Sequence, residues 1–302
     1  MQKRLVVVGG PTAVGKTALG IELAKSLNTE IISADSRQFY QELAIGTAKP
    51  SPEELAEVKH HFVDNLSIHD AYSAGDFERE VLRFLEEYFI DNDVMVMVGG
   101  SGLFVRAVSE GLDEFPDVPE DLRESLNHRL YSEGIEPLQK ELKKLDKETY
   151  ETMDIHNSQR LVRALEVCLS EGKPYSYYKN KSKLKRNFET INIGLNTDRE
   201  VLYDRINQRV DIMMNRGLLK EAKTNYEFRD LAALKTVGYQ ELFDHIDGKT
   251  SLEEAKEFIK RNTRRFAKRQ ITWFKKEKGI KWFEPNELKE ILNYLKDEFN
   301  VD

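Results

Sequence analysis

Residues 9–17 read GGPTAVGKT and follow directly on the apolar run LVVV. From Gly10 to Thr17 the stretch fits the spacing G-x-x-x-x-G-K-[ST], and the residues KTALGIELAKSL at its end have the apolar spacing of a helix. In a loop between a strand and a helix, such glycines let backbone N–H groups turn toward phosphate oxygens, and the helix directs the positive end of its dipole at them. The pattern predicts a phosphate-binding site on an α/β fold.

The side chains at the end of this loop add to the predicted site. Lys16 contributes a positive charge, and the hydroxyl of Thr17 is suited to bind Mg²⁺, so Thr17 is the predicted metal ligand. The residues predicted to bind the phosphate groups are Gly10, Pro11, Thr12, Ala13, Val14, Gly15, Lys16 and Thr17.

Further short apolar runs predict the rest of a parallel sheet. We expect strands at residues 4–10, 30–36, 94–102 and 190–196, and a short one at IKWFE, residues 280–284. DFEREVLRFLEEYFIDN, residues 76–92, has the spacing of an amphipathic helix. Strands that alternate with helices predict an α/β fold, a P-loop core whose parallel sheet is flanked by helices.

Residues 116–180 interrupt this alternation. They begin at a turn that contains Pro116 and Pro119, have helical spacing throughout, and end shortly after the sequence GKP. We therefore predict an all-helical insertion domain at 116–180. Residues 1–115 and 181–302 are predicted to form the catalytic core, with a basic helical region toward the C-terminus.

The composition excludes several classes of protein. With 40% hydrophobic and 33% charged residues and no apolar run that could cross a bilayer, the chain is predicted to be globular and to have no membrane partner. Its N-terminus does not resemble a secretory signal. The single cysteine, Cys168, rules out an internal disulfide and a multi-cysteine zinc site, and core packing is its predicted role. We expect a cytoplasmic protein, and a monomer, because nothing in the sequence demands a dimer.

Charge is unevenly distributed along the chain. The net charge is −7, yet residues 256–281 hold 11 Lys or Arg and only 2 Glu, a local charge of +9 that leaves −16 for the remainder. Such an asymmetry is a reason to look for a polyanionic partner at this segment, although composition alone fits a solvated basic helix better.

An aspartate, Asp35, ends the second predicted strand in IISADSRQ. An NTP-hydrolysing protein normally carries a metal-binding aspartate after a further apolar strand, but here that strand ends in GGSG. A carboxylate beside a phosphate loop suits a general base, and closing a turn is the alternative role of Asp35. Ser36, Arg37 and Gln38 offer donors and acceptors for reading the edge of a base. The residues alone thus fit a small-molecule kinase or a transferase with a diphosphate leaving group.

The whole chain resembles the bacterial tRNA dimethylallyltransferase family. The matching segments are DSRQFY (35–40), GTAKP (46–50), HHFVD (60–64), YSAGDF (72–77), GGSGLF (99–104), NSQRLVRALEV (157–167), GKPYS (172–176), DREVLYDRINQRVDIMMNRGL (198–218), VGYQE (237–241) and AKRQITWF (267–274). Two departures stand in GGSGLF, where the family usually has Thr and Tyr. Ser101 keeps the hydroxyl, whereas Phe104 lacks the phenol oxygen.

The resemblance implies a reaction. The phosphates would be those of dimethylallyl diphosphate, and N6 of adenosine 37, in tRNAs reading codons that begin with U, would attack the allylic C1 and release diphosphate. Asp35 would accept the N6 proton. Lys16, Mg²⁺ on Thr17 and Arg209 would stabilise the leaving group. The implied catalytic residues are Asp35, Thr17 and Arg209, and an ion pair of Arg209 with Asp204 or Asp211 is the alternative.

The resemblance also implies a tRNA-binding surface that takes the anticodon stem-loop. Base chemistry on RNA requires the base to be extruded, and RNA is read mainly in loops. The implied contacts are Asp35, Ser36, Arg37, Gln38, Ser101, Arg123, Gln159, Arg160, Arg163, Gly238, Tyr239, Gln240, Lys268, Arg269 and Gln270. A solvated helix face is the alternative for Gln159, Arg160 and Arg163.

Three other functions compete with tRNA prenylation. An adenylate isopentenyltransferase would prenylate free nucleotide and would not need the basic segment 256–281. A P-loop kinase would need a basic lid, which is not recognisable here. A P-loop switch or scaffold protein would carry a base-recognition motif and a second-strand aspartate, and we find neither.

Overall fold

The computed structural model describes residues 2–179 and 185–299. The chain folds into two compact units, residues 1–110 with 186–302, called the core unit, and residues 111–185, called the helical unit. The predicted domain boundaries lay at 115/116 and at 180/181, and the second of these falls outside the described residues.

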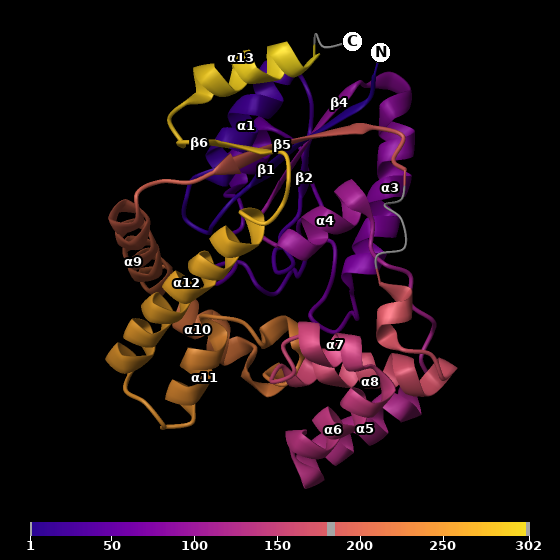
Figure 1. The fold of residues 1–302 in the computed structure, drawn as a ribbon. Coiled ribbons are helices and arrows are strands. Elements are labelled where there is room, and N and C mark those ends of the chain that lie inside the picture. The colour runs from indigo at the N-terminus through magenta and orange to yellow at the C-terminus, as the bar shows by residue number, and fades with distance from the viewer. Residues whose placement is uncertain (1, 180–184, 300–302) are drawn as a thin grey trace. The chain divides into compact units, whose positions relative to one another are not determined.

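A six-stranded parallel sheet forms the centre of the core unit (Figure 1). Its strands are β1 (Arg4–Gly9), β2 (Ile31–Ser33), β3 (His60–His61), β4 (Val94–Gly99), β5 (Glu189–Leu195) and β6 (Ile280–Phe283), in the order β3-β2-β4-β1-β5-β6. All five pairings are parallel. The predicted α/β fold with a parallel sheet is therefore confirmed. The two-residue strand β3 was not predicted, because two histidines give no apolar run.

Helices cover both faces of this sheet. The helices of the core unit are α1 (Lys16–Leu27), α2 (Pro52–Glu57), α3 (Ala74–Asp91), α4 (Gly102–Glu110), α9 (Arg199–Asn215), α10 (Leu218–Thr224), α11 (Tyr239–Ile246), α12 (Leu252–Phe274) and α13 (Leu288–Phe299), and some of them pack on the sheet. Val6 and Val8 of β1 pack with α1 and α13, whereas Leu5 and Val7 pack with α3 and α4. Since alternate residues of a strand point to opposite faces and both faces are covered, β1 is apolar from Leu5 to Val8.

A third hydrophobic cluster lies beyond the sheet. Leu218, Leu242 and Ile259 from α10, α11 and α12 pack there against Tyr40 and Leu43, which belong to the loop after β2. This loop also carries Asp35 near its start, so the third cluster fixes the segment that carries the predicted base.

The helical unit contains α5 (Glu120–Glu133), α6 (Ile135–Leu145), α7 (Lys147–Thr152) and α8 (Ser158–Glu171). Its own core includes Leu126, Leu142 and Leu165. Cys168 is buried in it and accepts a hydrogen bond from the backbone N–H of Tyr175, so the predicted core packing of the cysteine is confirmed. In the described ranges no helix of either unit is long and apolar enough to span a bilayer.

Arg186 anchors the place where the chain returns to the core unit. Its guanidinium donates to the backbone carbonyls of Ala107 and Val108, at 2.6 and 2.9 Å, and to the carboxylate of Glu78 at 2.5 Å. Ala107 and Val108 lie in the last turn of α4, just before the chain leaves the core unit. Exit and return are therefore adjacent within the core unit itself.

Candidate active site

The phosphate loop between β1 and α1 has the backbone that its glycines allow. Gly10 and Gly15 have φ angles of +147° and +114°, backbone conformations that residues with a side chain rarely adopt. A Cβ on Gly10 would also lie 2.6 Å from the carbonyl oxygen of Leu195. Ala13 also has a positive φ, +64°. Gly15 is the N-cap of α1, so the free N–H groups of the first helical turn open into the loop.

Lys16 is half-buried, with its side chain held against the loop. Its Nζ donates to the carbonyl oxygen of Pro11 at 2.7 Å. Burial lowers the pKa of Lys16 to about 8, with Asp35 acting in the opposite direction and Arg209 adding to the lowering. Among the described residues no carboxylate forms an ion pair with Lys16 within 4 Å, so an incoming anion would supply the missing counter-charge.

Two cavities meet beside this loop. The phosphate cavity has a volume of about 480 Å³ and is lined by Lys16, Thr17 and the loop backbone. The apolar cavity, about 570 Å³, is lined by hydrophobic side chains that include Phe104, Phe266 and Trp273. Both cavities share Thr12, Asp35, Thr47, Ala48, Gly100, Arg209 and Met213. The junction thus joins a site for an anion to a site for an apolar or aromatic group.

Asp35 lies at this junction, as a general base for chemistry there must. One carboxylate oxygen accepts a hydrogen bond from the backbone N–H of Arg37 at 3.0 Å, so the turn-closing role considered for Asp35 is also present. Burial raises the pKa of Asp35, and the Arg37 N–H and the charge of Lys16 reduce the rise. A half-buried carboxylate that has no ion pair in the described ranges accepts a proton more readily than an exposed one.

Arg209 reaches the junction from α9. Its Nη1 donates to the hydroxyl of Thr12 at 3.3 Å. Burial lowers the pKa of Arg209, and Asp35 counteracts this. The alternative of an ion pair with Asp204 or Asp211 is not realised within 4 Å among the described residues, and Asp211 instead binds Lys256 and Lys260, each at 3.0 Å. Arg209 is therefore a positive charge aimed into the site.

Sequence reasoning missed Arg205, one turn before Arg209 on α9. Its Nη1 donates to the carbonyl oxygen of Val14 in the phosphate loop at 3.1 Å, and its side chain lines the phosphate cavity. The spacing of four residues would have placed both arginines on one helix face, which was a usable signal.

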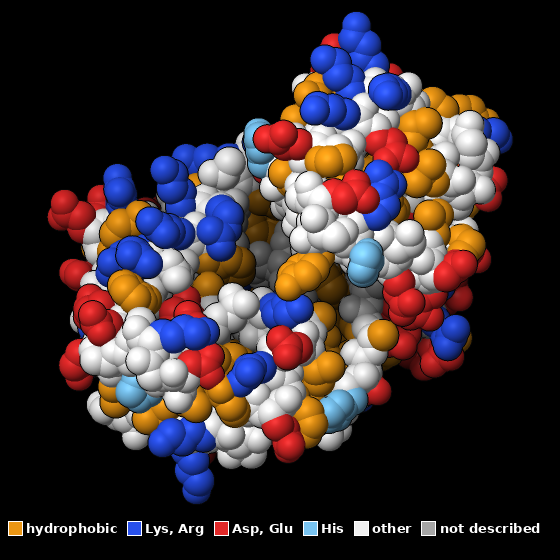
Figure 2. All heavy atoms as spheres, turned by 90° about the horizontal axis from the view of Figure 1, so that it is seen from below, with side chains coloured by type: hydrophobic (Ala, Val, Ile, Leu, Met, Phe, Trp, Pro, Cys, Tyr) orange, Lys and Arg blue, Asp and Glu red, His pale blue; other side chains and the backbone are white. Residues whose placement is uncertain are grey.

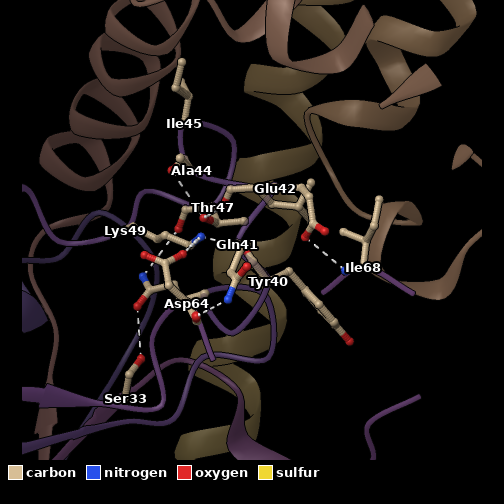
Figure 3. Close-up of polar contacts among 12 residues, drawn as sticks. Ser33, Tyr40, Gln41, Glu42, Ala44, Ile45, Thr47, Lys49, Asp64 and Ile68 are labelled. Atoms are coloured by element: carbon tan, nitrogen blue, oxygen red, sulfur yellow. Dashed lines mark hydrogen bonds and ion pairs between the residues drawn. The ribbon is translucent and has the colours of Figure 1, made fainter. Parts of the chain in front are cut away.

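Hydrogen bonds hold the loop after β2 in a fixed path (Figure 3). Gln38 accepts from the hydroxyl of Ser33 at 3.0 Å and donates to the carbonyl of Ala48 at 3.2 Å. Lys49 donates to the Tyr40 carbonyl and pairs with Asp64. The sequence predicted that Gln38 contacts tRNA. In the structure its side-chain amide forms hydrogen bonds within the protein.

Ser101 is placed to support Asp35. Its hydroxyl accepts a hydrogen bond from the backbone N–H of Ser36 at 3.0 Å and lies 3.2 Å from the Ser36 hydroxyl. Ser36, Arg37 and Ser101 all line the apolar cavity. These side chains are therefore brought together where an acceptor group would enter.

Two of the predicted tRNA contacts are corrected by their burial. Tyr239 is fully buried and donates its phenol hydrogen to Glu221 at 2.6 Å, and Gln270 is 6% exposed with its amide bonded inside the protein. Both predictions came from the family resemblance. Burial and the bond to Glu221 remove the Tyr239 side chain from contact with RNA, whereas Gln270 lines the apolar cavity with both polar atoms of its amide bonded inside the protein. The buried Gly238 offers no side chain, whereas Gln240 is exposed and lines the apolar cavity.

The basic segment forms most of α12 and the residues after it. Lys268 and Arg269 are exposed, and Arg269 lines the apolar cavity. Figure 2 shows Lys and Arg side chains gathered on the side of the core unit that contains α9 to α12. Phe274 is buried in the core at the end of the helix, while Phe266 lines the cavity.

The helical unit carries the other predicted contacts. Arg123 donates two hydrogen bonds to Glu166, at 2.8 and 2.7 Å, and Arg163 donates a third at 2.6 Å. Gln159 and Arg160 are exposed and, with Arg163, line a cavity of about 410 Å³ that also includes Tyr175. Burial alone would raise the pKa of Glu166, but the hydrogen bonds from both arginines outweigh it and lower that pKa.

The chain is similar to proteins of one family over its full length. The sequence model of the family described as IPP transferase matches residues 38–277. The tRNA dimethylallyltransferase of Christiangramia forsetii is 54% identical over 302 residues, with 100% of both chains covered. The enzyme of the same name from Flavobacterium johnsoniae is 51% identical over 97% of both chains.

Solved structures show the same similarity in three dimensions. The tRNA isopentenylpyrophosphate transferase of Bacillus halodurans is 37% identical, covers 98% of this chain and 97% of its own, and has a TM-score of 0.73. A eukaryotic dimethylallyltransferase acting on tRNA is 26% identical with a TM-score of 0.80, over 95% of this chain and 75% of its own.

Proposed function

Because the chain belongs to the tRNA dimethylallyltransferase (IPP transferase) family, we propose that it transfers a dimethylallyl group from dimethylallyl diphosphate to N6 of adenosine 37 in tRNAs that read codons beginning with U, with release of diphosphate. The protein is an enzyme, a prenyltransferase, and tRNA is its substrate. The position of the adenosine, the donor and the anticodon stem-loop as binding partner are the finer parts of the proposal.

One observation supports the reaction most directly: Asp35, Thr12 and Arg209 line both cavities. A diphosphate in the phosphate cavity would have its allylic carbon at the junction. An adenine in the apolar cavity would have its exocyclic amine at the same place. Donor, acceptor and base would then meet without movement of the core unit, which is the arrangement that favours a direct transfer.

The step consists of one substitution and one proton transfer. The N6–C1 bond forms, the bond between C1 and the diphosphate oxygen breaks, and the electron pair of the broken bond leaves with diphosphate. The N6 proton passes to Asp35. Lys16, Arg209 and the N–H groups of the loop face the oxygens on which negative charge develops, and a partly desolvated site strengthens that stabilisation.

The side chains fit a magnesium ion that is held largely by the donor. Thr17 lines the phosphate cavity, and the part of the chain that the structure describes has no group of three His, Cys, Asp or Glu side chains that could bind a metal. Few protein ligands together with substrate phosphates are the usual environment of Mg²⁺. Bound there, Mg²⁺ would neutralise charge on the diphosphate.

Exposed basic residues support the tRNA part of the proposal. Lys268 and Arg269 in the core unit, and Arg160 in the helical unit, are the cations that would contact phosphates of the anticodon arm. Arg37 and Gln240 line the apolar cavity and would contact the extruded nucleotide. An enzyme with a tRNA substrate would act in the cytoplasm, and one chain supplies every group named here, in keeping with a monomer.

The test is incubation of the protein with dimethylallyl diphosphate, Mg²⁺ and unmodified tRNA that reads codons beginning with U. Mass spectrometry of the anticodon loop should show one dimethylallyl group on N6 of adenosine 37, with one diphosphate released per group. A tRNA with guanosine at position 37 is the matched control and should remain unmodified. Product on AMP but not on tRNA would contradict the proposal and would favour an adenylate isopentenyltransferase. Phosphate transfer from ATP would favour a kinase.

A further inference from the structure

Gln270 is a buried amide that bridges two loops of the active site. It lies in the last turns of α12, next to the exposed Lys268 and Arg269, yet is only 6% exposed itself. Its Oε1 accepts a hydrogen bond from the backbone N–H of Thr12 at 2.8 Å, and its Nε2 donates to the carbonyl oxygen of Gly100 at 3.0 Å. The three residues are far apart in the sequence, so this amide joins the phosphate loop to the loop between β4 and α4.

The partners of this amide specify its chemistry. The Thr12 N–H can only donate and the Gly100 carbonyl can only accept, so the bridging group needs an acceptor on one side and a donor on the other. A carboxamide meets both demands, whereas a carboxylate has no donor and an aliphatic side chain has neither. A buried polar atom left without a partner is costly, so the bridge is strongly tied to glutamine.

The bridge is tightly enclosed. A Cβ added to Gly100 would lie 2.3 Å from Gln270 Nε2 and 3.5 Å from Lys16 Nζ. Real Cβ atoms essentially never approach a neighbour as closely as 2.3 Å. The absence of a side chain on Gly100 is therefore what allows the amide to reach the loop.

The bridge also determines what Thr12 can do. Its backbone N–H is occupied by Gln270, so it is not free to bind a phosphate oxygen, in contrast to the role predicted for Thr12 from the loop pattern. Its hydroxyl faces the junction and accepts from Arg209 at 3.3 Å. Thr12 is thus held between Gln270 and Arg209, at a position that both cavities share.

We propose that Gln270 is a positioning residue of the transferase reaction. It holds the phosphate loop and the β4–α4 loop at the separation that the donor diphosphate requires, and it directs Arg209, through Thr12, at the leaving group. This inference rests on the proposed function for the identity of the donor. Gln270 also lines the apolar cavity, but both polar atoms of its amide are bonded to the two loops, so its role is to position these loops and not to form hydrogen bonds with RNA.

The experiment compares Gln270→Met, which removes both hydrogen bonds at similar volume, with Thr272→Ala, an exposed change on the same helix. We expect Gln270→Met to weaken binding of inorganic diphosphate about tenfold in calorimetry and to lower kcat about tenfold, since small displacements of positioned groups have effects of this size or more. The KM for tRNA should change less than twofold. Thr272→Ala should match the wild type in all three.

Two further variants keep the test informative if Gln270→Met does not fold. Gly100→Ala should reproduce its effects by pushing the amide out of the bridge. Gln270→Glu should bind diphosphate poorly at neutral pH and recover toward the wild type as the pH falls, because a protonated carboxyl can both accept from Thr12 and donate to Gly100. Each value is compared with that of the wild type at the same pH, which cancels the titration of diphosphate itself.

The outcomes separate this inference from the proposed function. Unchanged diphosphate binding with a raised KM for tRNA would overturn the inference and would make Gln270 an RNA contact. Equal loss in Gln270→Glu at every pH would also overturn it. Diphosphate binding does not depend on tRNA, so this arm remains decisive even if the wild type modifies no tRNA.

Discussion

The charged groups of the two units are arranged in opposite ways. At the junction in the core unit, Lys16, Asp35 and Arg209 are half-buried and form no ion pair with one another within 4 Å in the described ranges. In the helical unit, Arg123 and Arg163 share the carboxylate of Glu166, which is 1% exposed, while their own side chains remain 55% and 37% exposed.

The difference shows which charges the fold satisfies and which it leaves to a ligand. Unpaired, partly desolvated charges are costly in the free protein and are neutralised only when an anion and a proton donor bind. Such charges therefore serve substrate binding and catalysis. Arginines that form ion pairs at a surface have a fixed side-chain orientation and contribute little net electrostatic energy. Such arginines therefore serve the recognition of a partner by its shape. Changes in the two regions should therefore affect different measurements.

The largest effect is expected from Asp35→Asn. The amide keeps the size of the side chain but does not take a proton from adenine N6, so kcat should fall by about 10²–10⁴. Diphosphate binding, measured by calorimetry, should weaken less than threefold, because Asn removes no contact to phosphate. A kcat within a factor of five of the wild type would show that Asp35 is not the base, and would contradict the assignment of the unpaired charges of the core unit to catalysis.

A change of pH should have a smaller effect, through Lys16. A lysine with a pKa of about 8 in the free enzyme is charged below that pH and neutral above it. Since the neutral form attracts diphosphate less, kcat/KM for dimethylallyl diphosphate should fall about tenfold for each pH unit above about 8.

The control for this profile is Lys16→Arg, in which the cation does not titrate. Its kcat/KM should be lower overall but should show no decline between pH 8 and 9.5. A decline of equal slope in both proteins would assign the titration to another group.

The smallest effect on turnover is expected in the helical unit, from Glu166→Gln. Loss of the carboxylate frees both arginines, so the KM for tRNA should rise about threefold while kcat stays within twofold. The free energy of unfolding should fall by about 1–2 kcal/mol, less than for a fully buried pair because Arg123 and Arg163 face solvent. Glu151→Gln, in an exposed pair with Lys147, is the control and should change neither value.

The same carboxylate predicts a pH dependence of stability. Because its pKa is lower in the folded protein than in the unfolded chain, Glu166 stabilises the fold above its ordinary pKa of 4.5. This contribution is lost as the pH falls through the folded-state value. Thermal unfolding below pH 4.5 should then differ less between Glu166→Gln and the wild type than it does at pH 7.

Sequence patterns predicted the elements that have strong local signals. The phosphate loop, the apolar strands and the helical insertion all follow from spacing over a few residues. Asp35 was also found, because parallel strands place their carboxyl ends at one edge of the sheet. Strand β3 was missed, since pairing with Ile31 and Ile32 of β2, and not the composition of His60–His61, makes it a strand.

The errors concern contacts between segments far apart in the chain. The family motif around Tyr239 does not reveal the partner of this residue. The carboxylate of Glu221 accepts a hydrogen bond from the Tyr239 hydroxyl, and it also accepts hydrogen bonds from the backbone N–H groups of Ala44, Ile45 and Gly46. Gln270 was placed with its exposed neighbours for the same reason. Burial of one residue in an amphipathic helix depends on what packs against it, and that information is not local.

The anchoring by Arg186 makes the helical unit a removable module. Since the carbonyls of Ala107 and Val108 lie within hydrogen-bonding distance of the Arg186 guanidinium, a turn of a few residues would be long enough to connect α4 directly to the segment before β5. Loss, exchange or enlargement of the intervening helices would then leave the sheet and its phosphate loop undisturbed. Evolution of this fold is thereby free to vary one unit while the other stays constant.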